Sequence, residues 1–224
     1  MENTRYRRGF AKDVHDLIPN WEPQVIFDIG ANVGQTAVAF TQFFPKAFIY
    51  SFEPVPKSFQ KLNAVASQHT NVRAFQIAFG DYSGTANMTV NGTSTRNCIT
   101  LDREVAANTA EVSITTGVEF MEEHQLEKIS FLKVDAEGFD LRVLKGFSSK
   151  LADIDFVQVE AGMNSYNQTH VALSAFSDYL SLHNFYLFKI YNQVFEFSSG
   201  RQPLLRRSNP VFVNGRFCDL QGLK

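Results

Sequence analysis

The chain of 224 residues has little cysteine and no long apolar run. Its two cysteines, Cys98 and Cys218, lie far apart and lack metal-ligand spacing, so we expect two free thiols in a reducing compartment. No stretch approaches the roughly 20 apolar residues that a membrane-spanning helix needs, so we expect no membrane span. The N-terminal stretch lacks an apolar core of the signal-peptide type, which favours a cytoplasmic protein.

An excess of charge of one sign is also missing. The chain holds 21 Lys and Arg residues against 23 Asp and Glu residues, for a formal net charge of -2 at pH 7. Such a balance creates no general attraction to nucleic acid, so we expect no nucleic-acid partner. With 44% hydrophobic and 20% charged residues, the composition is that of an ordinary globular protein, and the length favours one domain or at most two.

What the chain does contain is a regular alternation of short apolar runs and amphipathic segments. The pattern predicts strands over residues 24–30, 47–54, 71–80, 129–138, 154–162, 185–191 and 210–215. It predicts helices over residues 35–44, 56–67, 118–125, 139–147 and 170–183. Strands separated by helices are typical of an α/β fold with a parallel sheet. Residues 85–116 interrupt this alternation, and their many Thr and Asn residues predict polar β-hairpins or an irregular loop.

The loop "FDIGANVGQT" follows the first predicted strand. Its glycines, Gly30 and Gly34, flank Asn32, and this spacing misses by one position the pattern that binds a dinucleotide pyrophosphate. Asp28 stands at the predicted strand tip, where a carboxylate would repel a pyrophosphate and suit an ammonium or sulfonium group. The loop, Ala31 included, therefore favours S-adenosylmethionine over NAD. The alternatives are that Asp28 caps loop amides, that the glycines serve only the turn, and that Asn32 holds the loop shape without contacting a ligand.

Acids also stand at the ends of the next two predicted strands. Glu53 ends the second strand beside Pro54, where a carboxylate can accept hydrogen bonds from both ribose hydroxyls. This placement supports an adenosine-type ligand without separating S-adenosylmethionine from NAD, and a simple surface acid is the alternative. After the third strand, the stretch from Ala78 to Asp81 either contacts the adenine ring through its backbone or the Asp81 carboxylate, or is a mere turn.

Four stretches, "FDIGANVGQT", "SFEPVPKSFQKL", "AFGDYSG" and "FLKVDAEGFDLRVLKG", together resemble the FkbM family of S-adenosylmethionine-dependent methyltransferases. The motif D-x-G-A-N-x-G is shared with many class I methyltransferases, and its combination with K-x-D-x-E-G-x-D-x-x-V-L-K-G is specific. The resemblance runs from about Val25 to Gly146 and more loosely to the end. It implies an α/β class I methyltransferase (Rossmann-like) fold, a doubly wound sheet of seven strands, mostly parallel with the last antiparallel. It also implies methylation of a hydroxyl on a sugar, a glycan or a secondary metabolite.

The resemblance divides the chain into two parts. We expect residues 1–24 to form an N-terminal helical or cap segment and residues 25–224 to form the methyltransferase domain. A dimer is compatible with the sequence, which does not indicate an oligomeric state.

Methyl transfer to a hydroxyl needs a group that removes the hydroxyl proton. In "KVDAEG", Lys133, Asp135 and Glu137 share one face of a strand at a period of two. Asp135 can act as the base, bind a metal, orient the methionine ammonium or play a structural part, and Lys133 is expected to pair with Asp135 or Glu137. Glu137 is the second candidate catalytic residue, although it can instead cap the following helix.

Glu160 is the third candidate catalytic residue and ends the next predicted strand. If that strand lies beside the one ending at Asp135, the two carboxylates can bind a divalent ion or share a proton with a substrate hydroxyl. A metal is not favoured, because the acid and amide arrangement of known metal-dependent O-methyltransferases is not reproduced. His170 is either a base or a surface residue at a helix start. Tyr166 either packs on a sugar ring or is an ordinary loop aromatic.

Three other classes of protein fit the sequence less well. Enzymes that methylate amino groups of nucleic acid place a D/N-P-P-Y/F element where this chain has "DAEG". A dinucleotide-dependent oxidoreductase is disfavoured by the glycine spacing and by Asp28. A non-catalytic domain that binds S-adenosylmethionine, or an interaction domain on the same fold, is the remaining alternative.

Overall fold

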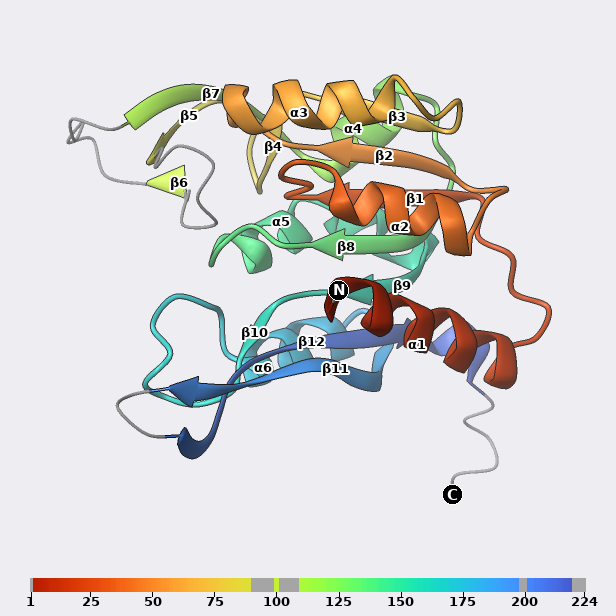
Figure 1. Ribbon diagram of the computed structural model, residues 1–224, viewed down its shortest axis with the longest axis vertical. Coiled ribbons are helices and arrows are strands. Elements are labelled where there is room, and N and C mark those ends of the chain that lie inside the picture. Colours follow the sequence, from red (N-terminus) through yellow and green to blue (C-terminus); the bar gives the residue numbers. More distant parts are fainter. Residues whose placement is uncertain (1, 90–98, 101–108, 198–200, 219–224) are drawn as a thin grey trace.

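The computed structural model describes residues 2–89, 99–100, 109–197 and 201–218 (Figure 1). Its main sheet has the order β3-β2-β1-β8-β9-β12, with β11 and the short β10 also paired to β12. The strands are β1 Val25–Ile29, β2 Phe48–Phe52, β3 Val72–Phe75, β8 Ile129–Val134, β9 Ile154–Gln158, β10 Ala161–Gly162, β11 Phe185–Phe197 and β12 Arg201–Asn214. Neighbours from β3 to β9 are parallel, and β12 is antiparallel to β9 and β11. The expected class I methyltransferase sheet, mostly parallel with one antiparallel strand, is confirmed.

Helices cover both faces of this sheet. They are α1 Glu2–Leu17, α2 Gln35–Phe43, α3 Pro56–Ala66, α4 Gly117–Glu123, α5 Asp140–Lys145 and α6 Leu173–Ser181, with 3-10 turns at Ser148–Asp153 and Gly215–Phe217. Helices α1 and α2 lie in front of the sheet in Figure 1, and α5 and α6 lie behind it. Adjacent strand residues serve opposite faces, because side chains alternate along a strand. Ile26 belongs to the core cluster with α1 and α2, and Phe27 to the cluster with α4 and α5.

A second, smaller sheet stands beside the carboxyl ends of the main strands (Figure 1). Its order is β4-β7-β5-β6, from β4 Ala78–Phe79, β5 Gly84–Thr89, β6 Ile99–Thr100 and β7 Thr109–Thr115. Strands β5 and β7 are antiparallel, so the described part of the 85–116 segment forms strands, while residues 90–98 and 101–108 lie outside the described residues. The expected excursion is therefore a sheet of its own.

The structure corrects three element boundaries. The strand expected over 71–80 is two strands, because β3 ends level with the last residue of β2 and Ala78–Phe79 then pair with β7 of the second sheet. Strands β11 and β12 form an antiparallel pair far longer than the predicted 185–191 and 210–215. The helix expected over 170–183 begins only at Leu173.

Two absences expected from the sequence can be checked in part. No helix in the described part of the chain is long and apolar enough to cross a membrane. Cys218 is a free thiol, whereas Cys98 lies outside the described residues.

The N-terminal segment belongs to the core of the sheet. Phe10 of α1 is 2% exposed, and its ring centroid lies 4.7 Å from that of Phe131 on β8 and 5.6 Å from that of Phe156 on β9. Trp21 continues the contact by donating from Nε1 to Asp155 Oδ2 at 2.9 Å. Helix α1 lies within residues 1–24, and its buried side chains Phe10 and Val14 cover one face of the sheet.

We therefore expect Phe10→Ala to lower the free energy of unfolding by about 3–5 kcal/mol, because it empties an aromatic site inside the core. Leu17→Ala on the same helix is the matched control, since Leu17 is 68% exposed and its loss should cost under about 0.5 kcal/mol. Denaturant unfolding of both variants measures the difference. A small effect of Phe10→Ala would show that α1 is only an appended cap.

Candidate active site

A pocket of about 720 Å³, counting space open to solvent, lies at the carboxyl ends of β1, β2 and β8. Strand order reverses beside β1, because β2 and β3 lie on one side of it and β8 and β9 on the other. Ligands of open α/β sheets bind at such a switch point. The residues that line this part of the pocket are Ile29, Gly30, Asn32, Phe52, Glu53, Pro54, Asp135, Ala136 and Glu137.

The loop after β1 lies directly on the end of β8. Gly30 has a φ of +75°, and a Cβ atom there would be 1.9 Å from the carbonyl oxygen of Asp135. The amides of Gly30 and Ala31 both donate to the carbonyl of Phe52, at 3.0 and 2.9 Å. Only glycine allows this approach, so the motif glycine brings the ends of three strands together.

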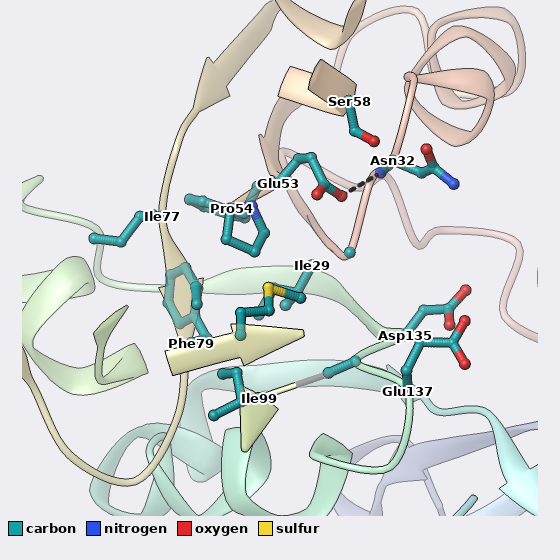
Figure 2. Close-up of a pocket in the computed structure, with 15 residues that line it drawn as sticks. Ile29, Asn32, Glu53, Pro54, Ser58, Ile77, Phe79, Ile99, Asp135 and Glu137 are labelled. Carbon is teal, nitrogen blue, oxygen red and sulfur yellow. Dashed lines mark hydrogen bonds between the residues drawn. The ribbon is translucent and has the colours of Figure 1, made fainter. Parts of the chain in front are cut away.

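Glu53 ties the β1 loop to the β2 loop. Its carboxylate accepts from the amide of Asn32 at 3.0 Å and from the amide of Val55 at 2.9 Å (Figure 2). Burial raises the pKa of the Glu53 carboxyl, and these two amide bonds oppose that rise. An acid at the end of β2 that is buried and lines the pocket is thus no simple surface acid.

Asp28 does not line the pocket. Strand register places it opposite Lys133, and Lys133 Nζ donates to Asp28 Oδ1 at 2.8 Å while lying 3.7 Å from Asp135 Oδ2. Asp28 is fully buried, so the expectation that its carboxylate faces a ligand directly is corrected. Lys133 thus joins Asp28 to Asp135, which is one of its two expected partners.

The second sheet supplies an apolar wall that the sequence did not reveal. Ile77, Phe79, Met88 and Ile99 line the pocket together with Ala78 (Figure 2). Met88 and Ile99 belong to β5 and β6, which only the fold brings over the strand ends. The one local signal was the position of Ala78 near the end of the third predicted strand.

Asp135 and Glu137 lie next to each other in the loop after β8, with both carboxylates pointing away from the apolar wall (Figure 2). Burial, followed by the negative charge of Asp135, raises the pKa of Glu137 to about 7. No side chain caps α5, whose N-cap residue is Phe139; Asp140 at its start accepts from the amides of Ala136 at 3.2 Å and Gly138 at 3.0 Å in the preceding loop. Burial and Asp135 also raise the pKa of Asp140 to about 6. Glu137 does not cap the helix, and it lines the pocket.

Glu160 contacts a histidine and an arginine instead of Asp135. It is buried, its Oε2 lies 2.7 Å from His170 Nε2, and its Oε1 binds Arg207 Nη1 of β12. The His170 side chain is only 5% exposed, so it is not a surface residue at a helix start. The acid close to this pair is Glu137, since ligand atoms of Glu137, Glu160 and His170 all lie within 4.8 Å of one another.

Four other residues named from the sequence lie away from the pocket walls. Asp81 pairs with Arg142, accepting from its Nε at 2.8 Å, and it does not line the pocket. Gly34 caps the start of α2 in a left-handed conformation, and buried Ala31 contributes its amide to the loop. Tyr166 is 82% exposed on the loop after β10.

The charges of the pocket decide which ligand fits. Glu53, Asp135 and Glu137 line it, and no lysine or arginine does among the described residues. Asn32 Oδ1 is buried without a hydrogen-bond partner in the described structure, which leaves an acceptor for a donor group. Such a lining fits the ammonium, ribose and adenine of S-adenosylmethionine and opposes a pyrophosphate. A metal on Glu137, Glu160 and His170 would have to displace the contacts of Arg207 and His170 with both Glu160 oxygens.

The raised pKa of Glu137 makes a prediction about stability. Its folded pKa of about 7 exceeds the ordinary glutamate value, so its stabilising contribution is full at low pH and is lost as pH rises through about 7. At about pH 8.5, Glu137→Gln should raise the free energy of unfolding by about 1 kcal/mol, a figure reduced for solvent screening. At about pH 4 the gain should vanish. Exposed Glu123→Gln is the control, and unchanged or lower stability of Glu137→Gln at the higher pH would contradict the prediction.

Comparison with known proteins identifies the fold and the family. The family described as "Methyltransferase FkbM domain" matches residues 28–196, which is more than half of the chain. The crystal structure of methyltransferase FkbM from Methylobacillus flagellatus KT is similar with a TM-score of 0.56 and 14% identity, covering 86% of this chain and 44% of that chain. At that identity the similarity supports the fold alone.

Two relatives carry more specific names. Hexuronic acid methyltransferase AglP of Haloferax volcanii is 28% identical over 166 residues, which cover 69% of this chain and 63% of AglP. The chain thus spans less than two thirds of the length of AglP. The 2-O-methyltransferase NoeI of Sinorhizobium fredii is 24% identical over 189 residues, covering 75% of each chain. The family match, the sheet order and the pocket agree, and the chain belongs to the FkbM family of S-adenosylmethionine-dependent methyltransferases.

Proposed function

We propose that the protein transfers a methyl group from S-adenosylmethionine to a hydroxyl oxygen of a sugar, a glycan or a similar metabolite. The observation that carries the proposal is the lining of the pocket at the switch point, where Glu53, Asp135 and Glu137 meet an apolar wall and no described lysine or arginine. Anionic walls favour a ligand with ammonium and sulfonium charges over one with phosphates.

The cofactor-binding residues follow from their places in the pocket. Glu53 is positioned for the ribose hydroxyls, with Pro54 beside it, and the wall that includes Ala78 and Phe79 suits adenine. The loop of Gly30 and Asn32 faces the methionine end. Asp28 supports that end from behind, through the contact of Lys133 with Asp135. When bound, the cofactor supplies an electrophilic methyl group on a sulfonium.

The acid pair after β8 provides the chemistry on the acceptor side. A base is most effective when its pKa lies near the working pH, and the pKa of Glu137 is raised to about 7. The Glu137 carboxylate therefore takes the proton of the acceptor hydroxyl and leaves that oxygen with the electron pair for the new bond. Asp135, bound by Lys133 on one side, orients donors of the bound molecules and keeps the charge next to Glu137 negative.

The acceptor class rests on the relatives. AglP is named for a hexuronic acid and NoeI for a 2-O position, and these two names favour a hydroxylated acceptor for this chain. Asp135 and Glu137 point away from the apolar wall, which leaves them free to meet a polar, hydroxylated molecule (Figure 2). A hydroxyl of a sugar is therefore the first acceptor to test.

Calorimetric titration tests the cofactor site. We expect S-adenosylhomocysteine to bind and NAD not to bind. Glu53→Gln should weaken S-adenosylhomocysteine binding by about 1.5–3 kcal/mol, because a charge-assisted pair of hydrogen bonds to the ribose is lost. Exposed Glu22→Gln is the matched control and should bind as the unchanged protein does. Binding of NAD alone would overturn the proposal, and binding of neither would favour a non-catalytic domain.

Turnover tests the base. With labelled S-adenosylmethionine and a panel of hexuronic acid and neutral sugar glycosides, Glu137→Gln should reduce methyl transfer about 10²–10⁴-fold, the usual contribution of a positioned base. Its affinity for S-adenosylhomocysteine should stay close to that of the unchanged protein. Transfer that survives Glu137→Gln and fails in Asp135→Asn, with binding intact, would assign the base to Asp135 instead.

A further inference from the structure

Behind Glu137 lies a compact group of charged side chains that the proposed chemistry does not use. Glu160 stands past the end of β9 and is 6% exposed. One of its oxygens binds Arg207 of β12, and the other lies 2.7 Å from His170 Nε2. Ligand atoms of Glu137 fall within 4.8 Å of those of Glu160 and His170. Side chains from three other positions, Glu160, His170 and Arg207, thus gather close to Glu137, on the side away from the pocket.

Both ring nitrogens of His170 have polar partners within the described structure. Asn167 Oδ1 accepts from the amides of Thr169 and His170, each at 3.1 Å, while Asn167 Nδ2 donates to the carbonyl of Arg206 at 2.8 Å. These bonds fix the orientation of the amide, so it is an oxygen that lies 3.1 Å from His170 Nδ1. Nδ1 therefore faces an amide oxygen, and Nε2 faces the Glu160 carboxylate. Both ring nitrogens of His170 are engaged inside the protein, so neither is free to act as the base.

The loop that carries His170 is packed against the loop that carries Glu137. Gly138 has a φ of +94°, and a Cβ atom there would lie 2.4 Å from the carbonyl oxygen of Thr169. Glu137 itself has a φ of 49°, a left-handed conformation that is uncommon for glutamate and is retained where surrounding contacts enforce it. The two loops therefore fix the position of Glu137 relative to His170.

We propose that His170 and Arg207, both anchored on Glu160, are positioning residues that keep Glu137 a carboxylate able to accept the acceptor proton. The inference rests on the proposed function for its catalytic meaning, but the charge arrangement can be tested without turnover. Nothing in the family match or the relatives' names assigns a role to either residue.

The groups around Glu137 act in opposite directions. Asp135 and Asp140 raise its pKa in addition to burial, whereas His170 and Arg207 lower it. Glu160 adds negative charge but is bound by His170 and Arg207, and Lys133 is engaged by Asp28 and Asp135. Without His170 and Arg207, Glu137 would be surrounded by three other acids. Burial and the repulsion from these acids would then keep Glu137 protonated near neutral pH.

Carbon-13 NMR of protein labelled at the glutamate side-chain carboxyl carbon tests this directly. The Glu137 resonance is identified by its loss in Glu137→Gln, and its shift is followed from about pH 4 to about pH 9. We expect a titration midpoint near 7 in the unchanged protein. His170→Gln should move the midpoint up by about one pH unit, and Arg207→Gln should move it in the same direction. His15→Gln, on the exposed face of α1, is the matched control and should leave it unchanged.

The outcomes separate this inference from the proposed function. The inference would be overturned if the Glu137 titration midpoint were unchanged in both folded variants. It would also be overturned if the midpoint in the unchanged protein were at the ordinary glutamate value. A merely structural role of His170 would lower thermal stability without moving the midpoint. If His170→Gln does not fold, Arg207→Gln decides, because the Arg207 side chain is 39% exposed. Binding of S-adenosylhomocysteine to the same samples reports on the proposed function independently of the midpoint.

Discussion

The contact of the β1 loop with the backbone of Asp135 is the constraint on which the rest of the site depends. Gly30 allows the loop to lie on that carbonyl, at a distance that no other residue tolerates. The same loop is held to β2 by two amides that share the Phe52 carbonyl and by the bond from Asn32 to Glu53. The ends of β1, β2 and β8 thereby become one surface, and the acids after β2 and β8 enter one pocket. Charge placement in this pocket is a consequence of backbone packing.

Bringing so many acids together demands a partner for almost every carboxylate. Asp28 has Lys133, Asp140 has two backbone amides, and Glu160 has an arginine and a histidine. Glu137 receives no hydrogen bond from the described part of the chain, and it is the acid whose pKa is raised to about 7. A carboxylate without a hydrogen-bond donor lowers the free energy of unfolding at neutral pH, and it retains a proton affinity suited to a catalytic base. The loss of stability and the proposed catalytic role therefore belong to the same side chain, Glu137.

Much of this architecture could be predicted from the sequence, because periodicity and motif spacing act locally. The central strands, their helices and the loop of Gly30 follow from apolar runs and glycine positions. Three features could not be predicted. Strand register, which sets Asp28 opposite Lys133, depends on pairing between strands about 100 residues apart. The path of β4 into a second sheet depends on β7, and the placing of Glu160 depends on Arg207 of the last strand. Each is a long-range contact with no local signature.

Because Asp28 is buried against Lys133, other acids set the charge of the pocket, which is still negative. Asp28 and Lys133 form a buried pair whose charges largely cancel at the pocket, so neither sets its sign. The sign comes instead from Glu53, Asp135 and Glu137, which line the pocket. A carboxylate at the tip of β1 without its lysine would be an uncompensated buried charge beside Asp135. Lys133 therefore serves the pocket by binding both Asp28 and Asp135, and the negative charge of Asp135 helps raise the pKa of Glu137.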